Sequence, residues 1–383
     1  MCGVALGRID KQIFFGVFIK KVLYKITGHY HTGEKKMKTK IFWGISVAAA
    51  LLLCGCTDTT LQNMDSSSST QTTSSESSSS SSKTSSTASQ KETITINKRT
   101  TFAADKTYTV FKNTSIIIED GGEFLVDGKM ASEKGGEIII ESGGSMIMNN
   151  EVSLECELTI QEGGKLIVGE NGSVSGGGSI IVEDSFDDIK CSGSVKAKIV
   201  PPEPVKENGV TYVGGVLIVN KKHSLPSDFG SELILDDDAG TGLIIDEAYD
   251  ALLEMREASG YEMPIVSGFR SYRTQTAIYN RNVAEYGEEE ANTWSAKPGE
   301  SEHQTGMAID ISSLEQSYGD TEEGKWLAEN CHKYGFIIRY QKQKEDVTGY
   351  IFEPWHVRYL GESTARLVHD SGLALEEFLG VEG

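Results

Sequence analysis

Two histidines in the C-terminal half of the chain stand in segments that could hold a metal ion. His303 lies in the run Ser-Glu-His-Gln-Thr-Gly-Met-Ala-Ile-Asp, which ends at Asp310, and His356 follows Glu-Pro-Trp. A catalytic zinc site takes three nitrogen or oxygen ligands from the protein and leaves a fourth position for water. His303, Asp310 and His356 would supply that set. Taken alone, the His-x6-Asp spacing also fits two hydrogen-bonded polar residues on a loop and a strand.

The elements that must position these side chains belong to a mixed α+β domain that begins near residue 208. Amphipathic patterns with helix stop signals predict helices at 245–259, 272–285, 322–334 and 363–369. Short apolar runs predict strands at 215–219, 264–267, 308–311, 336–340 and 356–359. Asp310 and His356 would then lie on two strands, with His303 on the loop before one of them. Such ligands can converge from one side of a sheet.

The segments around these ligands resemble the motifs of the VanY-like D-alanyl-D-alanine carboxypeptidases, zinc peptidases of the LAS type that trim cell-wall stem peptides. The family patterns Ser-x-His-x6-Asp and Glu-x-Trp-His match residues 301–310 and 353–356. The pattern Ser-Gly-[Phe/Tyr]-Arg-Ser-x-x-x-Gln matches 267–275, and 217–226 resembles the strand that leads into the family's domain. The resemblance covers about 208–380 and implies an α+β zinc peptidase domain there.

The resemblance also implies a role for each matching residue. Three positions match the ligands of one zinc ion per chain: His303, Asp310 and His356. Glu353 matches the catalytic base and Arg270 matches the residue that stabilises the oxyanion, with a surface carboxylate and a structural ion pair as the respective alternatives. Three further positions match substrate contacts: Gln275, Ser301 and Tyr340.

These roles imply a zinc-dependent carboxypeptidase that removes the terminal D-Ala from peptidoglycan stem peptides. Members of the family that act as L,D-carboxypeptidases on the tetrapeptide stem share the same motifs, so that activity is an alternative. A third hypothesis is a cell-wall-binding adhesin with a degenerate peptidase domain. Serine acylation is excluded for this domain because it holds neither Ser-x-x-Lys nor Gly-x-Ser-x-Gly.

The N-terminal segment is typical of an exported lipoprotein. Four lysines at positions 35, 36, 38 and 40 precede the apolar run 41–53, which is the order of a secretory signal. The run ends in Leu-Cys-Gly-Cys, which resembles the bacterial lipobox with Cys56 as the lipidated residue. An ordinary cleaved signal or an uncleaved anchor is the alternative. Met37 stands where such a signal would start, so we interpret 1–36 as an upstream extension or a misassigned start.

Two regions of different character lie between the signal and the peptidase domain. Residues 57–92 are rich in serine and threonine and predict a disordered tether. From 93 to 200, short β-branched runs flank Gly-Gly pairs that begin at 121, 143 and 163. This period predicts a β-solenoid, which we interpret as a spacer, with a sandwich of hairpins and a glycan-binding surface as alternatives. Cys156 and Cys191 could pair, and a proline cluster at 201–207 predicts a linker.

Composition limits the class of partner. The 383 residues suggest two to three domains, and the formal net charge is −20. Phosphate binding needs clustered lysine and arginine, so an acidic chain argues against nucleic acid. We expect a monomer that is extracytoplasmic, held at the membrane through its lipid anchor, with peptidoglycan stem peptides as its partner.

Overall fold

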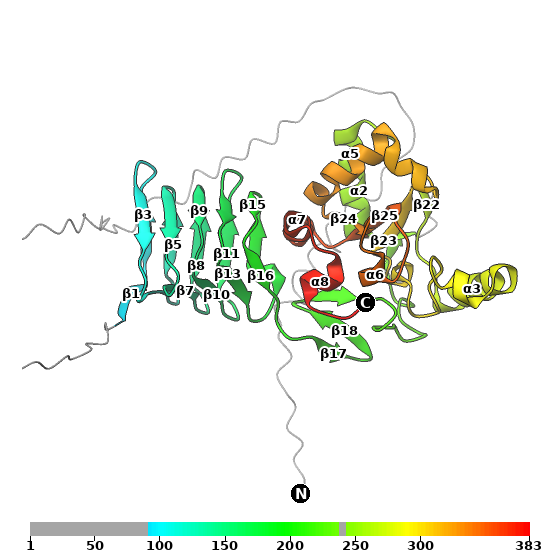
Figure 1. The fold of residues 1–383 in the computed structure, drawn as a ribbon, viewed down its shortest axis with the longest axis horizontal. Helices are drawn as coiled ribbons and strands as arrows, with labels where there is room; N and C mark the ends of the chain where they lie inside the picture. The colour runs from blue at the N-terminus through cyan, green and yellow to red at the C-terminus, as the bar shows by residue number, and fades with distance from the viewer. Residues whose placement is uncertain (1–90, 237–242) are drawn as a thin grey trace, which may run out of the picture. The chain divides into compact units, whose positions relative to one another are not determined.

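The computed structural model describes residues 91–236 and 243–383 (Figure 1). The predicted signal segment, Cys56 and nearly all of the predicted tether lie outside the described residues. Among the helices of the described ranges, none combines the length and the apolar character that crossing a bilayer requires.

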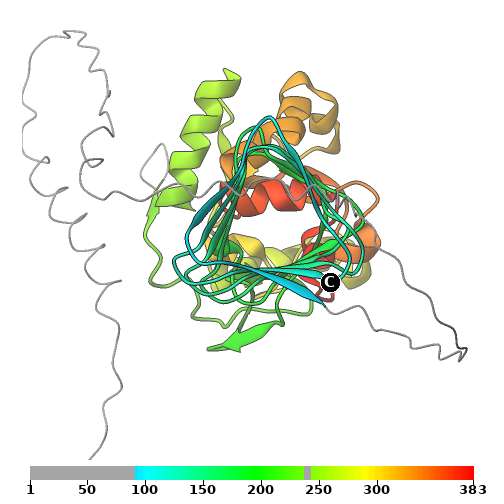
Figure 2. The same cartoon turned by 90° about the vertical axis from the view of Figure 1, so that its left-hand side faces the viewer.

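Residues 92–200 form a β-solenoid of three parallel sheets, which confirms the predicted solenoid over the sandwich of hairpins (Figures 1 and 2). The first sheet holds β1 (Glu92–Ile96), β4 (Thr114–Ile118), β7 (Glu137–Ile140), β10 (Glu157–Ile160), β13 (Ser179–Val182) and β16 (Lys198–Val200). The second holds β2 (Arg99–Phe102), β5 (Glu123–Val126), β8 (Ser145–Met148), β11 (Lys165–Val168) and β14 (Ile189–Cys191). The third holds β3 (Thr107–Val110), β6 (Lys129–Ser132), β9 (Glu151–Ser153), β12 (Ser173–Ser175) and β15 (Ser194–Val195).

In the strands of the inner coils, such as β5, β8 and β11, every second side chain points into the solenoid and is buried. Ile116, Ile138, Leu158 and Ile180 lie in register on neighbouring strands of the first sheet, and together they form one apolar column. The third sheet was not predicted, because β9, β12 and β15 carry only serine or glutamate beside a single buried valine.

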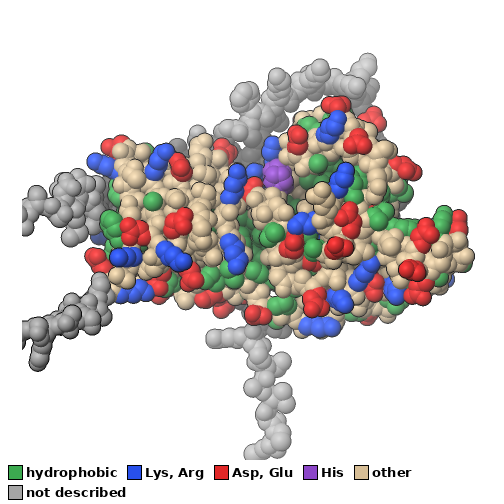
Figure 3. All heavy atoms as spheres, viewed as in Figure 1, with side chains coloured by type: hydrophobic (Ala, Val, Ile, Leu, Met, Phe, Trp, Pro, Cys, Tyr) green, Lys and Arg blue, Asp and Glu red, His purple; other side chains and the backbone are tan. Residues whose placement is uncertain are grey.

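Charged side chains of both signs are scattered over the face of the solenoid that Figure 3 shows. Some of them pair between neighbouring coils, such as Lys129 with Glu151 at 2.8 Å and Arg99 with Glu123 at 3.1 Å. Exposed ion pairs contribute only about 0–1 kcal/mol each. The stacking of the coils therefore depends on the buried apolar columns rather than on these pairs.

The two glycines of each Gly-Gly pair meet different requirements. Gly121 has φ +74°, a left-handed conformation that glycine adopts without strain, as expected for a tight corner. Gly164, the second glycine of its pair, would place a Cβ 2.6 Å from the carbonyl oxygen of Ile140 in the preceding coil. The second glycine is thus required because one coil passes close to the backbone of the next.

Replacing Gly164 by alanine should destabilise the solenoid more than replacing Gly121 does. Gly121→Ala should cost only the left-handed strain of about 1–2 kcal/mol, because a Cβ at this position would meet no atom within 4 Å. Gly164→Ala pushes against backbone and must force neighbouring coils apart. Urea unfolding followed by circular dichroism measures both, and equal midpoints for the two variants would contradict this account.

Residues 205–383 build the second half of the described chain around antiparallel sheets. The small sheets are β17 (Val205–Glu207), β18 (Val210–Val213) and β19 (Val216–Ile218), and β20 (Leu235–Asp236) with β21 (Ile244–Ile245). The central sheet has the order β22 (Ile265–Ser267), β23 (Ala308–Ile311), β25 (Glu353–Tyr359) and β24 (Phe336–Tyr340). The helices are α2 (Asp246–Ser259), α3 (Tyr272–Tyr286), α4 (Glu288–Ala291), α5 (Glu322–Asn330), α6 (Glu345–Thr348), α7 (Glu362–Ser371) and α8 (Leu375–Leu379). The 3-10 turns of this half are η2 (Glu302–Thr305), η3 (Gln316–Asp320) and η4 (Cys331–Tyr334), whereas η1 (Phe186–Asp188) lies in the last coil of the solenoid.

Three expectations about this half of the chain and the cysteines need correction. The helix expected over 322–334 ends at Asn330 and continues as the separate 3-10 turn η4, which Gly335 closes with φ +83°. The strand expected from His356 begins earlier, at Glu353. Cys156 and Cys191 are buried free thiols, because they lie at different corners of the solenoid.

Helix α7 joins the solenoid to the C-terminal domain. Leu367 and Val368 belong to the same buried cluster as the inward side chains of the solenoid. The side chain of Asp370 accepts a hydrogen bond of 2.8 Å from the backbone N–H of Val195 in the last coil. Solenoids need their end coils covered. Helix α7 covers this end against β14 and β15 and also packs on β24 and η4 of the C-terminal domain.

Candidate active site

The central sheet brings the three predicted metal ligands together. Asp310 on β23 stands directly opposite His356 on the neighbouring strand β25. His303 lies on the turn η2, and Gly306, with φ +68°, ends this turn and leads the chain into β23. Side chains that face each other across an antiparallel pair lie within contact distance. Two of the ligands are therefore fixed by strand register and the third by a short turn.

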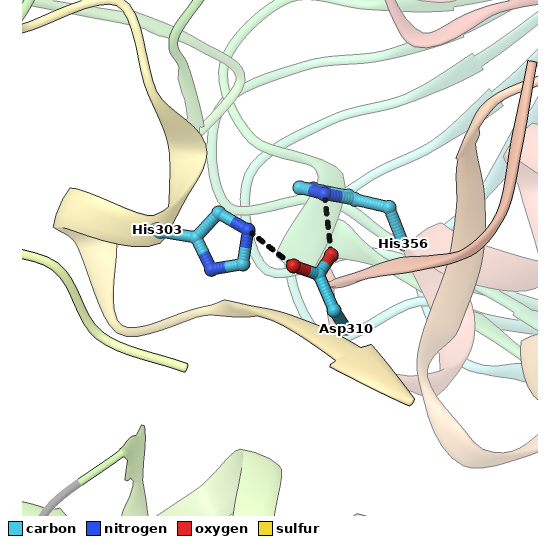
Figure 4. A group of neighbouring side chains, drawn as sticks. All are labelled: His303, Asp310 and His356. Atoms are coloured by element: carbon cyan, nitrogen blue, oxygen red, sulfur yellow. Dashed lines mark ion pairs between the residues drawn. The ribbon is translucent and has the colours of Figure 1, made fainter. Parts of the chain in front are cut away.

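The donor atoms of the three side chains converge on one point (Figure 4). One atom from each residue lies within 4.8 Å of the others. Nε2 of His303 is 3.3 Å from one carboxylate oxygen of Asp310, and Nδ1 of His356 is 3.1 Å from the other. All three residues are buried. Two imidazole nitrogens and a carboxylate are the donors that zinc takes in catalytic sites, so the set fits this metal.

The backbone of the segment 267–275 orients the side chain of His303. Nδ1 of its ring lies 2.9 Å from the carbonyl oxygen of Gly268, and the backbone N–H of Arg270 donates to the carbonyl of His303 at 3.1 Å. A ring nitrogen that donates to a carbonyl leaves the other nitrogen free to bind a metal. The segment 267–275 therefore holds His303 in the orientation that points its Nε2 towards Asp310.

Glu353 lies beside the ligands at the start of β25. One of its carboxylate oxygens is 3.6 Å from Nδ1 of His356. Burial raises the pKa of Glu353 to about 7, with Asp310 adding to the rise while His356 and Arg270 oppose it. A carboxylate with a pKa near neutrality can both take up and return a proton. A register shift between β24 and β25 places Tyr340 opposite Glu353.

Arg270 contributes a partly buried cation to the same site. Its Nη1 donates to the side-chain oxygen of Gln275 at 3.1 Å, and Gln275 in turn donates to the carbonyl of Ala296. The Nε atom of Arg270 is buried and has no hydrogen-bond partner within the described part of the chain. The guanidinium is therefore held in place on one side and keeps donor capacity on the other.

All the predicted site residues line one cavity of about 390 Å³: Arg270, Gln275, Ser301, His303, Asp310, Tyr340, Glu353 and His356. Burial raises the pKa of Tyr340 well above its ordinary value, so its hydroxyl stays protonated and can donate. The ring of Tyr340 packs against those of Tyr350 and His356, at centroid distances of 4.9 and 4.8 Å.

The apolar wall of this cavity was not predicted from the sequence. Ile278, Trp294 and Leu314 come from three separate segments and carry no motif that marks them. Glu302 was not predicted either, although it stands between the two predicted site residues Ser301 and His303, and its side chain has no exposed surface. Its position, as a charged residue between two predicted site residues, was the sequence feature that could have indicated a role for Glu302.

Comparisons with known proteins find relatives of the C-terminal part of the chain. The family profile VanY, described as D-alanyl-D-alanine carboxypeptidase, matches residues 243–362. A D-alanyl-D-alanine carboxypeptidase of Enterococcus faecalis is 35% identical over 187 residues, which are 46% of this chain and 70% of that protein. YodJ of Bacillus subtilis is 45% identical over 178 residues, which are 42% of this chain and 65% of that protein, just under two thirds of its length. A solved structure of the LdcB LD-carboxypeptidase is 39% identical in sequence and has a TM-score of 0.41. The match covers 47% of this chain and 94% of the LdcB chain.

Replacing Asp310 by alanine should remove the metal from the protein. Asp310 faces both imidazoles, and its loss leaves two ligands where a zinc site needs at least three. We expect elemental analysis after dialysis to find about one zinc per chain in the wild type and close to none in Asp310→Ala. Asp250→Ala, which removes an exposed carboxylate on α2, is the control. Equal metal content in Asp310→Ala and the wild type would rule out this ligand set.

Proposed function

Through its C-terminal domain this chain belongs to the VanY family of D-alanyl-D-alanine carboxypeptidases, and on that premise we propose that it is a zinc-dependent enzyme that removes the terminal D-Ala from peptidoglycan stem peptides. The observation that carries the proposal is the convergence of His303, Asp310 and His356 beside Glu353 in one cavity. An intact donor set argues against a degenerate peptidase that serves only as a wall-binding adhesin.

Each side chain of the site can be given a step in amide hydrolysis. Zinc held by the three ligands would supply a Lewis acid and lower the pKa of bound water to about 7. Glu353 takes the proton of the attacking water and passes it to the leaving amine, a contribution of about 10²–10⁴ in rate. Arg270 faces the oxygen that becomes negative during attack, and donors of this kind contribute about 10²–10³.

The cavity suits the end of a stem peptide. The described lining of the cavity contains no lysine and a single arginine, Arg270. The terminal carboxylate of the substrate and the oxyanion that develops during attack would therefore both be attracted to this guanidinium. Gln275, Ser301 and Tyr340 lie around it with polar atoms that can contact substrate. Apolar residues of the lining, such as Ile278, supply surface that suits the methyl group of alanine.

We further propose that the enzyme works outside the cytoplasm as a lipid-anchored monomer. Cys56, in its lipobox-like context, would carry the lipid, and the Ser-rich segment 57–92 would tether the folded part to the membrane. The solenoid would act as a spacer, since the face that Figure 3 shows has charged side chains scattered among uncharged ones and no large apolar patch. This arrangement would place the active site at the cell wall, where stem peptides occur.

Replacing Glu353 by glutamine should separate catalysis from metal binding. The amide keeps the size of the side chain but cannot take up a proton, so release of D-Ala from a pentapeptide should fall by about 10²–10⁴. Zinc content should stay at that of the wild type, because Glu353 is not among the three ligands. Glu345→Gln, which changes an exposed carboxylate on α6, is the matched control. Wild-type activity in Glu353→Gln would refute its role as the base.

The identity of the bond cleaved can be measured directly. We expect the zinc-loaded protein to shorten a pentapeptide ending in D-Ala-D-Ala by one alanine, and mass spectrometry of the product detects the loss. The tetrapeptide is the parallel substrate. Shortening of the tetrapeptide with the pentapeptide left intact would overturn the D,D assignment in favour of an L,D-carboxypeptidase.

A further inference from the structure

Glu302 is a buried carboxylate to which the hydrolysis described above gives no step. It precedes the ligand His303 on η2, and its side chain has no exposed surface. A buried charge is costly unless it is paired and hydrogen-bonded. The partners of its two oxygens therefore indicate what holds it there.

Only one of the two oxygens of Glu302 is hydrogen-bonded within the described residues. Oε1 accepts from Nε of Arg339 at 2.8 Å and from Nη1 of Arg358 at 2.9 Å. Oε2 is buried and accepts no hydrogen bond from the described part of the chain, and Nε2 of His356 likewise has no hydrogen-bond partner there. These two atoms lie 3.6 Å apart. The two buried polar atoms without partners thus face each other.

The opposite nitrogen of His356 points to the metal ligands. Nδ1 is 3.1 Å from the carboxylate of Asp310, whereas Nε2 faces Glu302. A carboxylate behind a metal-bound histidine fixes the tautomer and the orientation of the ring and makes the bound nitrogen more basic. The distance of 3.6 Å between Nε2 and Oε2 is slightly long for a hydrogen bond. A small rotation of the ring would close it.

We propose that Glu302 is a positioning residue for the metal centre, which accepts the Nε2–H proton of His356 in a hydrogen bond so that Nδ1 is directed to the zinc. This inference rests on the proposed function only in requiring that the site binds zinc. It assigns to Glu302 no contact with substrate.

The surrounding ion network prevents Glu302 from turning away. Arg339 is fully buried and also donates to both oxygens of Glu376 on α8. Arg358 donates with Nη2 to the carbonyl of Leu217 on β19 at 2.8 Å. Both arginines are therefore held by partners other than Glu302. They occupy Oε1 from fixed positions and leave Oε2 for His356.

This network makes Glu302→Gln a selective test. A glutamine has one side-chain oxygen, and the two arginines, which can only donate, require it. The NH₂ group would then face the Nε2–H of His356, donor against donor. The ring would have to rotate or to exchange its tautomer, and the affinity for zinc should fall.

The measurement is zinc affinity by competition with a chelator at fixed pH, using the whole chain. We expect Glu302→Gln to bind zinc about 10–100-fold more weakly than the wild type. Glu377→Gln is the control, because it changes a carboxylate on α8 that accepts from Lys344 and from the backbone N–H of Ala374, outside the hydrogen bonds of Arg339. Its affinity should stay within about threefold of the wild type. Equal affinity in Glu302→Gln and the wild type, or an equal loss in both variants, would overturn the proposal.

A second measurement needs no variant and covers the case in which Glu302→Gln does not fold. In the zinc-loaded wild type, ¹⁵N-correlated NMR of the histidine rings should show His356 bound through Nδ1 and protonated at Nε2. Binding through Nε2 would overturn the role of Glu302 while leaving the hydrolase intact. A wild type that binds no zinc would overturn both this inference and the proposed function, whereas a zinc-loaded protein without activity would leave the role of Glu302 standing.

Discussion

The pairing of β23 with β25 is the constraint on which the site depends. It sets Asp310 opposite His356, and the same strand β25 carries Glu353 three residues before this histidine. A shift of one residue in this register would move each of these side chains to the other face of the sheet. Nearly every residue of β25 is buried, so the register is specified by packing on both sides. The candidate metal ligands Asp310 and His356 are therefore positioned by strands that the surrounding core holds firmly.

Three buried carboxylates within this small region are held in different states by their neighbours. Burial alone would raise the pKa of each. It prevails at Glu353, whose pKa rises to about 7. At Glu302 the two arginines outweigh burial and hold the pKa well below its usual range, and at Asp310 the two histidines do the same to the pKa of that carboxyl. A carboxylate can thus serve as a proton carrier or as a permanent anion, depending on whether the hydrogen bonds and charges of its neighbours outweigh its burial.

The solenoid and the peptidase fold share a buried cluster rather than meeting through a loop alone. Phe186 of the last coil packs on Phe378 of α8 at a centroid distance of 5.2 Å, and α7 covers the end of the coils. Helix α8 also carries Glu376, which anchors Arg339 behind Glu302. The C-terminal helices therefore contact the solenoid through apolar side chains and the network behind the active site through Glu376. Each of the two folds thus contributes to the packing of the other.

The sequence by itself determined the family, the candidate ligands and the repeating character of the solenoid, because each of these can be recognised from residues that lie close together along the chain. The motifs around His303 and His356 and the Gly-Gly periods needed no knowledge of distant contacts. Only the tertiary structure decided which nitrogen of His356 faces Asp310, why the second glycine of a pair cannot carry a side chain, and that Glu302 is held by arginines from β24 and β25. These features depend on atoms that are far apart along the chain and meet only when the sheets have formed, so no local pattern encodes them.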